Sequence, residues 1–220
     1  MKHSHITQQF HPGVKIGSVP FVTRGRKEIP IHCEQGAWDS ACGAHCAAIA
    51  LAILGHIHDV SVLSERRNGV AARLWKAAKA KYFDGVNVVG LSSMLDSVDI
   101  PRKVAHYSGS HLGCVAYILS RLARQELVIA SWRSRQGHNH WILIVGMEGI
   151  QSQKTLVPSA LLALDPGATE PLLCAYNGRL ELLSGLKKSS TWRPYITSSN
   201  QNLIVRLTSA VALGSLALGK

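Results

Sequence analysis

The sequence predicts an α+β fold, in which N-terminal helices pack on a mostly antiparallel C-terminal sheet. Two observations predict this order. Between residues 42 and 124 the apolar residues recur at helical spacing, whereas from residue 127 onward they form short runs separated by Gly, Pro, Asn and Ser. We expect one domain over residues 31–220. An irregular arm over residues 1–30, rich in His, Gly, Pro and basic residues, precedes it.

The first expected helix is buried and begins near Cys42, with Ser40 or Asp39 as its N-terminal cap. Residues 46–54 are apolar on every side. Such a segment is typical of a helix enclosed by the rest of the protein and not of an amphipathic surface helix. Gly55 follows as a suitable C-terminal stop.

Three more helices are expected before the strands. Residues 70–82 have an apolar face, a short helix is expected near residues 91–97, and Ser110 can cap a helix that reaches about residue 122. The basic residues near the second helix fall on its opposite face: Arg66, Arg73, Lys76 and Lys79. Strands are expected at residues 127–132, 140–146, 161–164, 172–176, 180–183 and 203–207.

Composition excludes some classes of protein. A hydrophobic fraction of 46% and a charged fraction of 17% favour a globular domain over a disordered chain. The formal net charge of +11 implies attraction to acidic partners. The basic helix face is a surface on which an acidic protein could dock. Nucleic acid is a less favoured partner, because no nucleic-acid motif is present and aromatic residues are only 6% of the chain.

The cysteine pattern favours free thiols. Five cysteines leave one unpaired in any full pairing scheme, and no regular disulfide framework is visible. The first residues lack the apolar core of a signal peptide, and no run reaches the roughly 18 apolar residues of a membrane span. We therefore expect a cytoplasmic protein without a membrane span, and a secreted effector remains an alternative.

Cys42 is the expected nucleophile. A thiol attacks as the thiolate, and its free pKa of about 8.5 must be lowered by a helix N-terminus or a nearby imidazolium. Cys42 lies at a predicted helix start, and a histidine could supply the second influence. Gly43 is expected to leave room for the backbone of a substrate.

Three other residues are expected to complete this chemistry. His140 opens an apolar run and is the expected base, and Asp165 is the expected group that orients it. The side-chain amide of Gln35 and the backbone N–H of Cys42 are the expected donors to an oxyanion. No cofactor or metal ion is expected.

The chain order Gln, Cys, His, Asp resembles that of the papain-like cysteine hydrolases. Within them it is similar to bacterial peptidases related to the bacteriocin-leader-processing domains. In that group a Gln precedes a Cys-Gly pair, a His opens an apolar strand and an Asp-Pro pair follows the next strand. The matching residues here are Gln35, Cys42-Gly43, His140-Trp141 and Asp165-Pro166.

The resemblance covers about residues 33–185 through short motifs. It implies a papain-like fold and cysteine peptidase activity. Six residues separate Gln35 from Cys42, where many relatives have five, so the role of Gln35 is less secure than that of Cys42. The leader-processing relatives are usually fused to membrane transporters. This chain has no transporter, so their substrate does not carry over.

Some alternatives remain open for individual residues. His138 competes with His140 as the base, and Asn139 and Asn177 compete with Asp165 as the orienting group. Asp165 could instead start a turn, since Asp-Pro-Gly favours one. Zinc binding is another alternative for five residues that lie close together in the sequence, although their spacing is irregular for structural zinc: His32, Cys33, Cys42, His45 and Cys46.

Three functions fit these observations. The first is hydrolysis of a peptide or isopeptide bond through an acyl-enzyme. The second is deamidation or acyl transfer, which uses the same thioester chemistry. The third is a non-catalytic adaptor that binds an acidic partner through the basic helix face.

Overall fold

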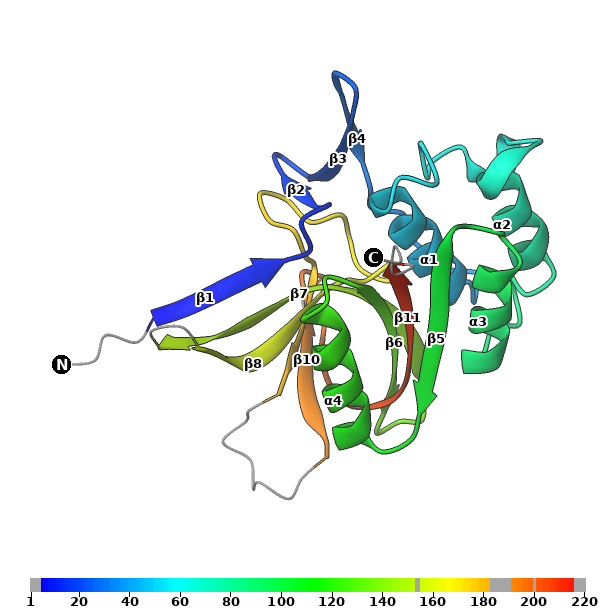
Figure 1. Ribbon diagram of the computed structural model, residues 1–220. Coiled ribbons are helices and arrows are strands. Elements are labelled where there is room, and N and C mark those ends of the chain that lie inside the picture. Colours follow the sequence, from blue (N-terminus) through cyan, green and yellow to red (C-terminus); the bar gives the residue numbers. More distant parts are fainter. Residues whose placement is uncertain (1–4, 153–154, 183–190, 200, 216–220) are drawn as a thin grey trace, which may run out of the picture.

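The computed structural model describes residues 5–152, 155–182, 191–199 and 201–215. Its centre is a closed ring of six antiparallel strands (Figure 1). The ring order is β7-β6-β11-β10-β9-β8, and a direct pairing of β7 with β8 closes it. The strands are β6 (Leu127–Ser134), β7 (Asn139–Ser152), β8 (Thr155–Leu164), β9 (Gly178–Glu181), β10 (Arg193–Thr197) and β11 (Asn202–Ser215).

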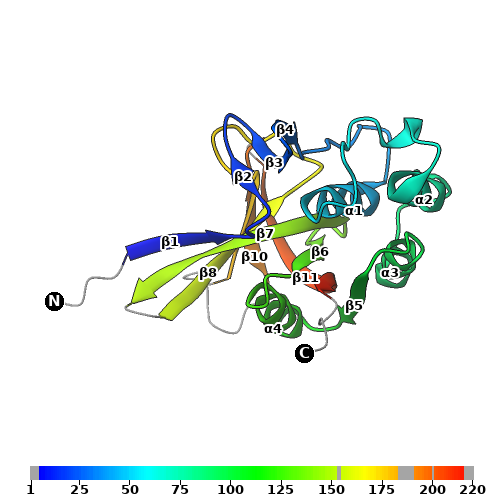
Figure 2. The same ribbon diagram turned by 45° about the horizontal axis from the view of Figure 1, so that its top comes forward.

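Two further strands extend this sheet outside the ring. β1 (His5–Phe10) pairs with β7, and β5 (Arg102–Ser108) pairs with β11. Figure 2 shows β1 running away from the ring beside β7. A separate three-stranded sheet is formed by β2 (Lys15–Ile16), β3 (Pro20–Arg24) and β4 (Lys27–Pro30).

The predicted α+β, papain-like fold is therefore wrong. The molecule is a closed antiparallel barrel of six strands with two extra strands, and strand outweighs helix by 39% to 24% of the chain. The prediction failed because local apolar patterns identify strands but carry no information on whether the first and last strands of a sheet pair with each other. Residues 1–30 were expected to be irregular, but from residue 5 onward they contain four strands.

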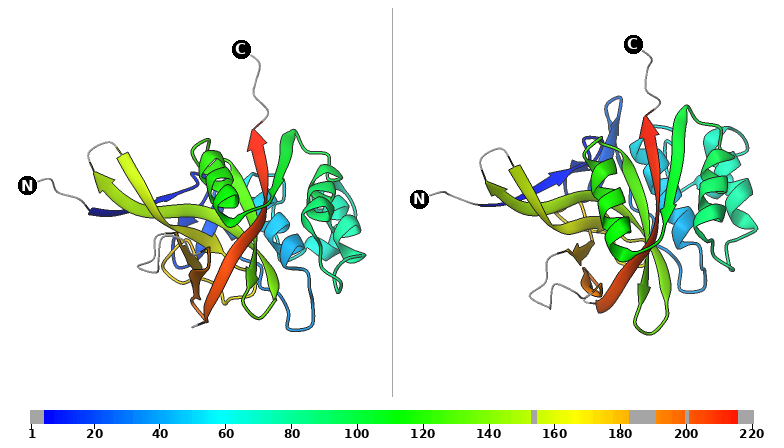
Figure 3. Two further views of the ribbon diagram at one scale, coloured as in Figure 1. Left: turned by 90° about the horizontal axis from the view of Figure 1, so that it is seen from below. Right: turned by 60° about the horizontal axis from the view of Figure 1, so that its bottom comes forward.

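Four α-helices and one 3₁₀ turn are present among the described residues. Three helices form one group beside β5 and β7, and the fourth lies apart from them beside β11 (Figure 3). The group comprises α1 (Cys42–Ile53), α2 (Gly69–Lys79) and α3 (Val88–Asp96), with the 3₁₀ turn η1 (Leu63–Glu65) next to α2. The fourth helix is α4 (His111–Leu122).

Side chains alternate between the two faces of each strand, so the buried residues form two separate clusters. Leu127 and Ile129 of β6 point toward α1, whereas Val128 and Ala130 belong to a second cluster that contains residues of all six ring strands. That second cluster is the interior of the barrel, and α4 adds Cys114 and Ile118 to it. α1 lies on the outer side and contacts β7. It is buried along most of its length, as its uniformly apolar sequence predicts.

Several local predictions agree with the structure. α1 begins at Cys42 and ends before Gly55, whose φ of +87° suits glycine. The Ser110 side chain accepts a hydrogen bond from the backbone of Gly113 at the start of α4. The predicted α1 cap is wrong, because Ala41 holds that position without a side-chain bond.

The strand predictions from residue 102 onward contain three errors. Residues 172–176 do not form a strand, and β5 and β10 were not foreseen. The C-terminal end of the predicted strand at residues 180–183 lies outside the described residues. None of the described helices is long and apolar enough to span a membrane.

Leu51 lies fully buried in α1, and its truncation should destabilise the protein. Leu51→Ala removes buried apolar atoms and leaves a cavity, so we expect the free energy of unfolding to fall by about 2–5 kcal/mol. Leu112→Ala is a matched control on α4, where the leucine is 66% exposed, and should change it by less than about 0.5 kcal/mol. Urea denaturation followed by circular dichroism measures both. Equal effects would contradict the assigned position of α1.

Candidate active site

Cys42 lies at the N-terminus of α1, where it is buried. The first helical hydrogen bond runs from His45 N to Ala41 O (3.0 Å), so the helix itself does not use the N–H groups of residues 42–44. No acidic residue occupies the first turn. The positive end of the helix dipole is therefore available to stabilise a thiolate on Cys42.

His140 and Asp165 meet at the ends of two neighbouring strands. β7 begins at Asn139 and β8 ends at Leu164, and these strands pair with each other. His140 Nε2 lies 2.6 Å from Asp165 Oδ1. The Cys42 thiol is close enough to the same imidazole to contribute to its raised pKa. Because Asp165 occupies Nε2, Nδ1 is the ring nitrogen left to interact with the thiol.

This arrangement favours the protonated form of His140. Burial by itself lowers the pKa of His140, but hydrogen bonds and charge interactions with Asp165 and Cys42 outweigh burial and raise that pKa to about 10. An imidazolium between a carboxylate and a thiol is the electrostatic setting that a thiolate nucleophile needs.

Asp165 is itself held by several groups in a buried position. Its Oδ2 accepts a hydrogen bond from the hydroxyl of the fully buried Tyr195 (2.6 Å), and its Oδ1 accepts one from Gly167 N (2.7 Å). Burial raises the pKa of Asp165, but bonds from His140, Tyr195 and Gly167 outweigh it and hold the pKa below its usual range. The carboxylate therefore stays ionised.

Asn177 fixes the backbone around Asp165. Its Oδ1 accepts from Asp165 N (2.6 Å), and its Nδ2 donates to the carbonyl oxygens of Asp165 (2.9 Å) and Thr169 (3.0 Å). Sequence reasoning had placed Asn177 among the alternatives for the group that orients His140. In the structure it holds the loop that carries Asp165.

Two neighbours restrict the position of the His140 ring. Trp132 pairs with His140 across β6 and β7, and the two ring centroids are 5.3 Å apart. A Cβ atom on Gly167 would lie 3.2 Å from Cε1 of His140, tighter than most real contacts. Glycine at residue 167 therefore lets the Asp165 loop approach the imidazole closely.

Gln35 lies beside the same loop, although its amide is partly occupied. Its backbone N–H donates to Pro166 O (2.6 Å), and its Nε2 donates to Asp39 O (2.6 Å). Its Oε1 is buried without a hydrogen-bond partner. One N–H of Nε2 remains for another acceptor.

Gly43 has a different function from the one expected. It is buried, and a Cβ atom there would lie 2.7 Å from Cγ2 of Val86 and 3.3 Å from Cδ1 of Trp141. Trp141 Nε1 also donates to Val86 O (2.9 Å). Glycine thus permits the start of α1 to pack against residue 86 and β7, and does not open space for a substrate.

The other candidate groups lie elsewhere. His138 is exposed, in the turn that precedes His140. All five cysteines are free thiols. Cys46 is fully buried, and its thiol donates to Trp141 O (3.4 Å). Within the described ranges no three His, Cys, Asp or Glu side chains are placed to hold a metal ion, so the zinc alternative has no geometric support.

Sequence reasoning did not identify Tyr195, Trp132 or Asp39 as parts of the site. Asp39 organises the loop before Cys42: its Oδ1 accepts from Ala41 N (3.0 Å) and its Oδ2 from Gly36 N (2.8 Å). An aspartate whose side chain can accept from the backbone N–H two residues further on is a recognisable local signal. The contact of Tyr195 with Asp165 spans 30 residues and depends on ring closure, so no local pattern reveals it.

Comparison with known proteins adds no assignment. The sequence matches no family model, and no curated protein is significantly similar to it.

Removal of the Asp165 charge should lower the pKa of His140. In Asp165→Asn the ion-pair partner is lost while burial persists, so we expect that pKa to fall from about 10 to near or below its ordinary value of 6.5. NMR titration of the ring nitrogens measures the change. Asp59→Asn, in a turn where the carboxylate binds Ser61, is the matched control and should leave His140 unchanged. A wild-type pKa near 6.5 would contradict the ion pair.

Proposed function

We propose that this protein is a cysteine hydrolase that cleaves a peptide or isopeptide bond through an acyl-enzyme on Cys42. The observation that carries the proposal is the position of the His140 imidazole, which is hydrogen-bonded to the Asp165 carboxylate and also interacts with the Cys42 thiol at the N-terminus of α1. This proposal rests on the geometry of the three side chains and not on a fold relationship.

In the proposed first step, the Cys42 thiolate, whose proton already resides on Nδ1 of the His140 imidazolium, attacks the substrate carbonyl carbon. The negative charge of Asp165 stabilises the imidazolium, and the N-terminus of α1 stabilises the sulfur anion. Collapse of the tetrahedral intermediate breaks the C–N bond. His140 gives its proton to the leaving amine, and a thioester remains on Cys42.

In the second step, His140 takes a proton from water, which attacks the thioester carbonyl. The acid product leaves, and the proton returns to the sulfur or remains on the imidazole. Asp165 keeps the ring oriented in both steps, because Tyr195 and Gly167 fix its two oxygens.

The oxyanion needs preorganised donors, and we assign two. The first is the backbone N–H of Cys42, which makes no hydrogen bond within the helix. The second N–H of Gln35 is the other, since Asp39 O accepts only the first. Loss of one such donor typically costs about 3–4 kcal/mol of transition-state stabilisation.

The same thioester would serve deamidation or transfer to an amine, which differ only in the bond broken or in the acceptor.

Exposed basic side chains on α2 also support the acidic partner that the sequence suggests. Arg66, Lys76 and Lys79 are exposed on and beside α2. Arg73 Nε donates to Val98 O (2.9 Å), so part of that side chain has a structural contact.

Alkylation across pH tests the activated thiol. We expect iodoacetamide to label Cys42 selectively at pH 6, read by peptide mass spectrometry against the other four cysteines. His140→Ala should slow labelling of Cys42 at pH 6 by about tenfold or more, because the thiol loses the imidazole that takes its proton. His138→Ala removes an exposed neighbouring histidine and should have no effect. Labelling that rises only near the free-thiol pKa in the wild-type protein would overturn the proposal.

Mass spectrometry of candidate protein substrates distinguishes the three outcomes of the chemistry. We expect chain cleavage by the wild-type protein and none by Cys42→Ala, because no other cysteine is placed against His140. A gain of about one dalton would indicate deamidation, and a new covalent adduct would indicate transfer. Cleavage that survives in Cys42→Ala would refute the assigned nucleophile.

A further inference from the structure

A pocket of about 170 Å³ lies between α1, η1 and α2, outside the Cys42–His140–Asp165 cluster. Most of its lining is apolar or aromatic. Its lining includes Cys33, Ala44, His45, Ala48, Trp75 and Tyr82.

The pocket is close to the proposed nucleophile. His45 lies three residues after Cys42 on α1, and side chains at that spacing are neighbours on a helix surface. His45 Nε2 is 3.7 Å from Asp39 Oδ2, and Tyr82 OH donates to the same oxygen (3.3 Å). Asp39 in turn organises the loop that leads to Cys42. The pocket is therefore joined to the site through one turn of helix and one loop.

The polar groups of the pocket are neutral. Cys33 Sγ lies 3.1 Å from His45 Nδ1. Burial raises the pKa of Cys33 to about 11, with a contribution from Asp39, and burial lowers the pKa of His45. The Cys33 thiol thus pairs with Nδ1 of a neutral His45, whose Nε2 is buried without a hydrogen-bond partner. No lining residue carries a charge that would select an ion. The volume suits one large side chain and is below the roughly 300–1,000 Å³ of small-molecule sites.

Exposed aromatic side chains continue this apolar surface toward Cys42. Trp38 is 93% exposed on the loop before Cys42, and Phe83 is 73% exposed. Phe83 packs edge-on against Tyr82, which lines the pocket, and Ser40 N donates to Tyr82 O (2.9 Å). Phe83 thus extends the aromatic surface that Tyr82 begins in the pocket.

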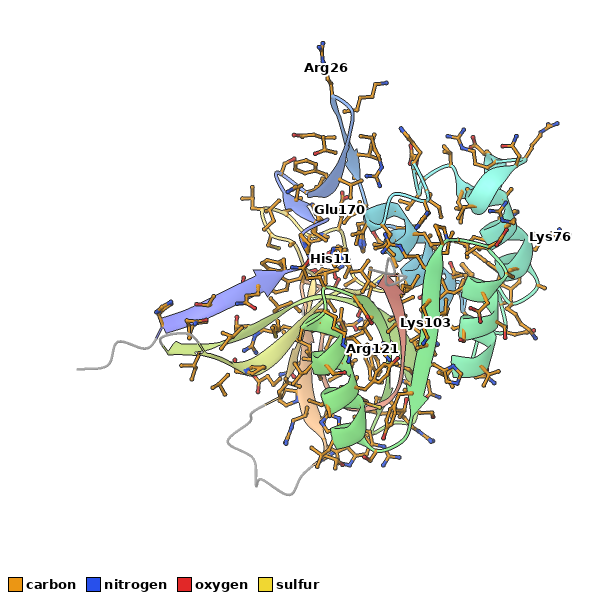
Figure 4. All side chains as sticks on the ribbon, in the orientation of Figure 1. His11, Arg26, Lys76, Lys103, Arg121 and Glu170 are labelled. Atoms are coloured by element: carbon orange, nitrogen blue, oxygen red, sulfur yellow. The ribbon has the colours of Figure 1, made fainter. Side chains whose placement is uncertain are left out.

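The outer face of α2 supplies charge next to the pocket. Residues 66–81 contain six basic residues and no acidic one. Lys76 follows the pocket residue Trp75 directly, and Figure 4 shows its side chain pointing outward from α2. Lys79 is exposed one turn further on. An occupant of the pocket that continues along this helix would be favoured by negative charge.

We infer that the substrate is a peptide segment whose large apolar side chain, preferably aromatic, enters this pocket, and whose flanking acidic residues lie along the basic face of α2. This inference rests on the proposed function and names the class of substrate for it. The pocket supplies the contacts for the side chain, and Lys76 and Lys79 supply complementary charge.

Binding to the Cys42→Ala protein tests the inference without turnover. Two pools of heptapeptides, identical except for Phe or Ala at one fixed central position and with Glu at the two positions after it, are compared by affinity selection and mass spectrometry. We expect the Phe pool to be retained about tenfold or more above the Ala pool, as burial of a phenyl group predicts. Equal retention would overturn the inference.

A variant that fills the pocket provides the second measurement. Ala44 is partly buried and lines the pocket, so Ala44→Leu should abolish the preference for Phe while retaining a folded protein. Ala72→Leu is the matched control, since Ala72 is partly buried on α2 but is not a lining residue. A preference for Phe that survives in Ala44→Leu would contradict the assigned pocket.

Charge reversal tests the acidic flank. Lys76→Glu with Lys79→Glu should weaken retention of the Glu-containing Phe pool by about tenfold and lower its dependence on salt. Arg26→Glu with Lys103→Glu, at two exposed positions away from α2, changes the net charge by the same amount and is the matched control (Figure 4). Equal effects of the two changes would show attraction by net charge alone and refute the role of α2.

Failure of this inference is distinguishable from failure of the proposed function. If alkylation shows an activated Cys42 but the Phe and Ala pools bind equally, the hydrolase proposal stands and the pocket assignment falls. If the Phe pool is preferred but Cys42 is not activated, the pocket is a recognition site and the hydrolase proposal falls.

Discussion

The geometry of the site depends on one buried contact, the 2.6 Å pairing of His140 Nε2 with Asp165 Oδ1. A carboxylate without a partner would be costly in this position, because burial removes it from water and typically destabilises the protein by several kcal/mol. Four groups reduce that cost: the His140 ring, the Tyr195 hydroxyl, the Gly167 amide and the Asn177 side chain behind the loop. Each of them also fixes the direction in which the imidazole faces Cys42.

The barrel explains how these groups come together. His140 and Asp165 lie at adjacent strand ends only because β7 pairs with β8, and Tyr195 reaches them because β10 is part of the same ring. α1 is outside the ring, and its buried apolar face sets the distance between Cys42 and the strand ends. The scaffold thus orients His140 and Asp165, while one helix holds the Cys42 thiol beside them.

The sequence predicts the parts of this arrangement that depend on local chemistry. Uniform apolarity from residue 46 to residue 54 identifies a buried helix, and the contexts of Cys42, His140 and Asp165 select three side chains that the fold does bring together. It does not predict ring closure, since the pairing of β7 with β8 and the position of β9 and β10 depend on contacts between distant segments. The same limit explains why Tyr195 was missed and Gly43 was misinterpreted. Their neighbours are 30 and 43 residues away in the chain.

The residues of the site come from segments far apart in the sequence, so the site cannot be complete while the chain is still being synthesised. Cys42 is made early, but the carboxylate that charges His140 is not fully held until residue 195 has emerged and β10 has paired within the ring. A nascent or partly folded chain therefore carries an ordinary thiol. If the proposed chemistry holds, reactivity appears only on completion of the barrel, so that folding itself acts as the safeguard against premature attack on other proteins.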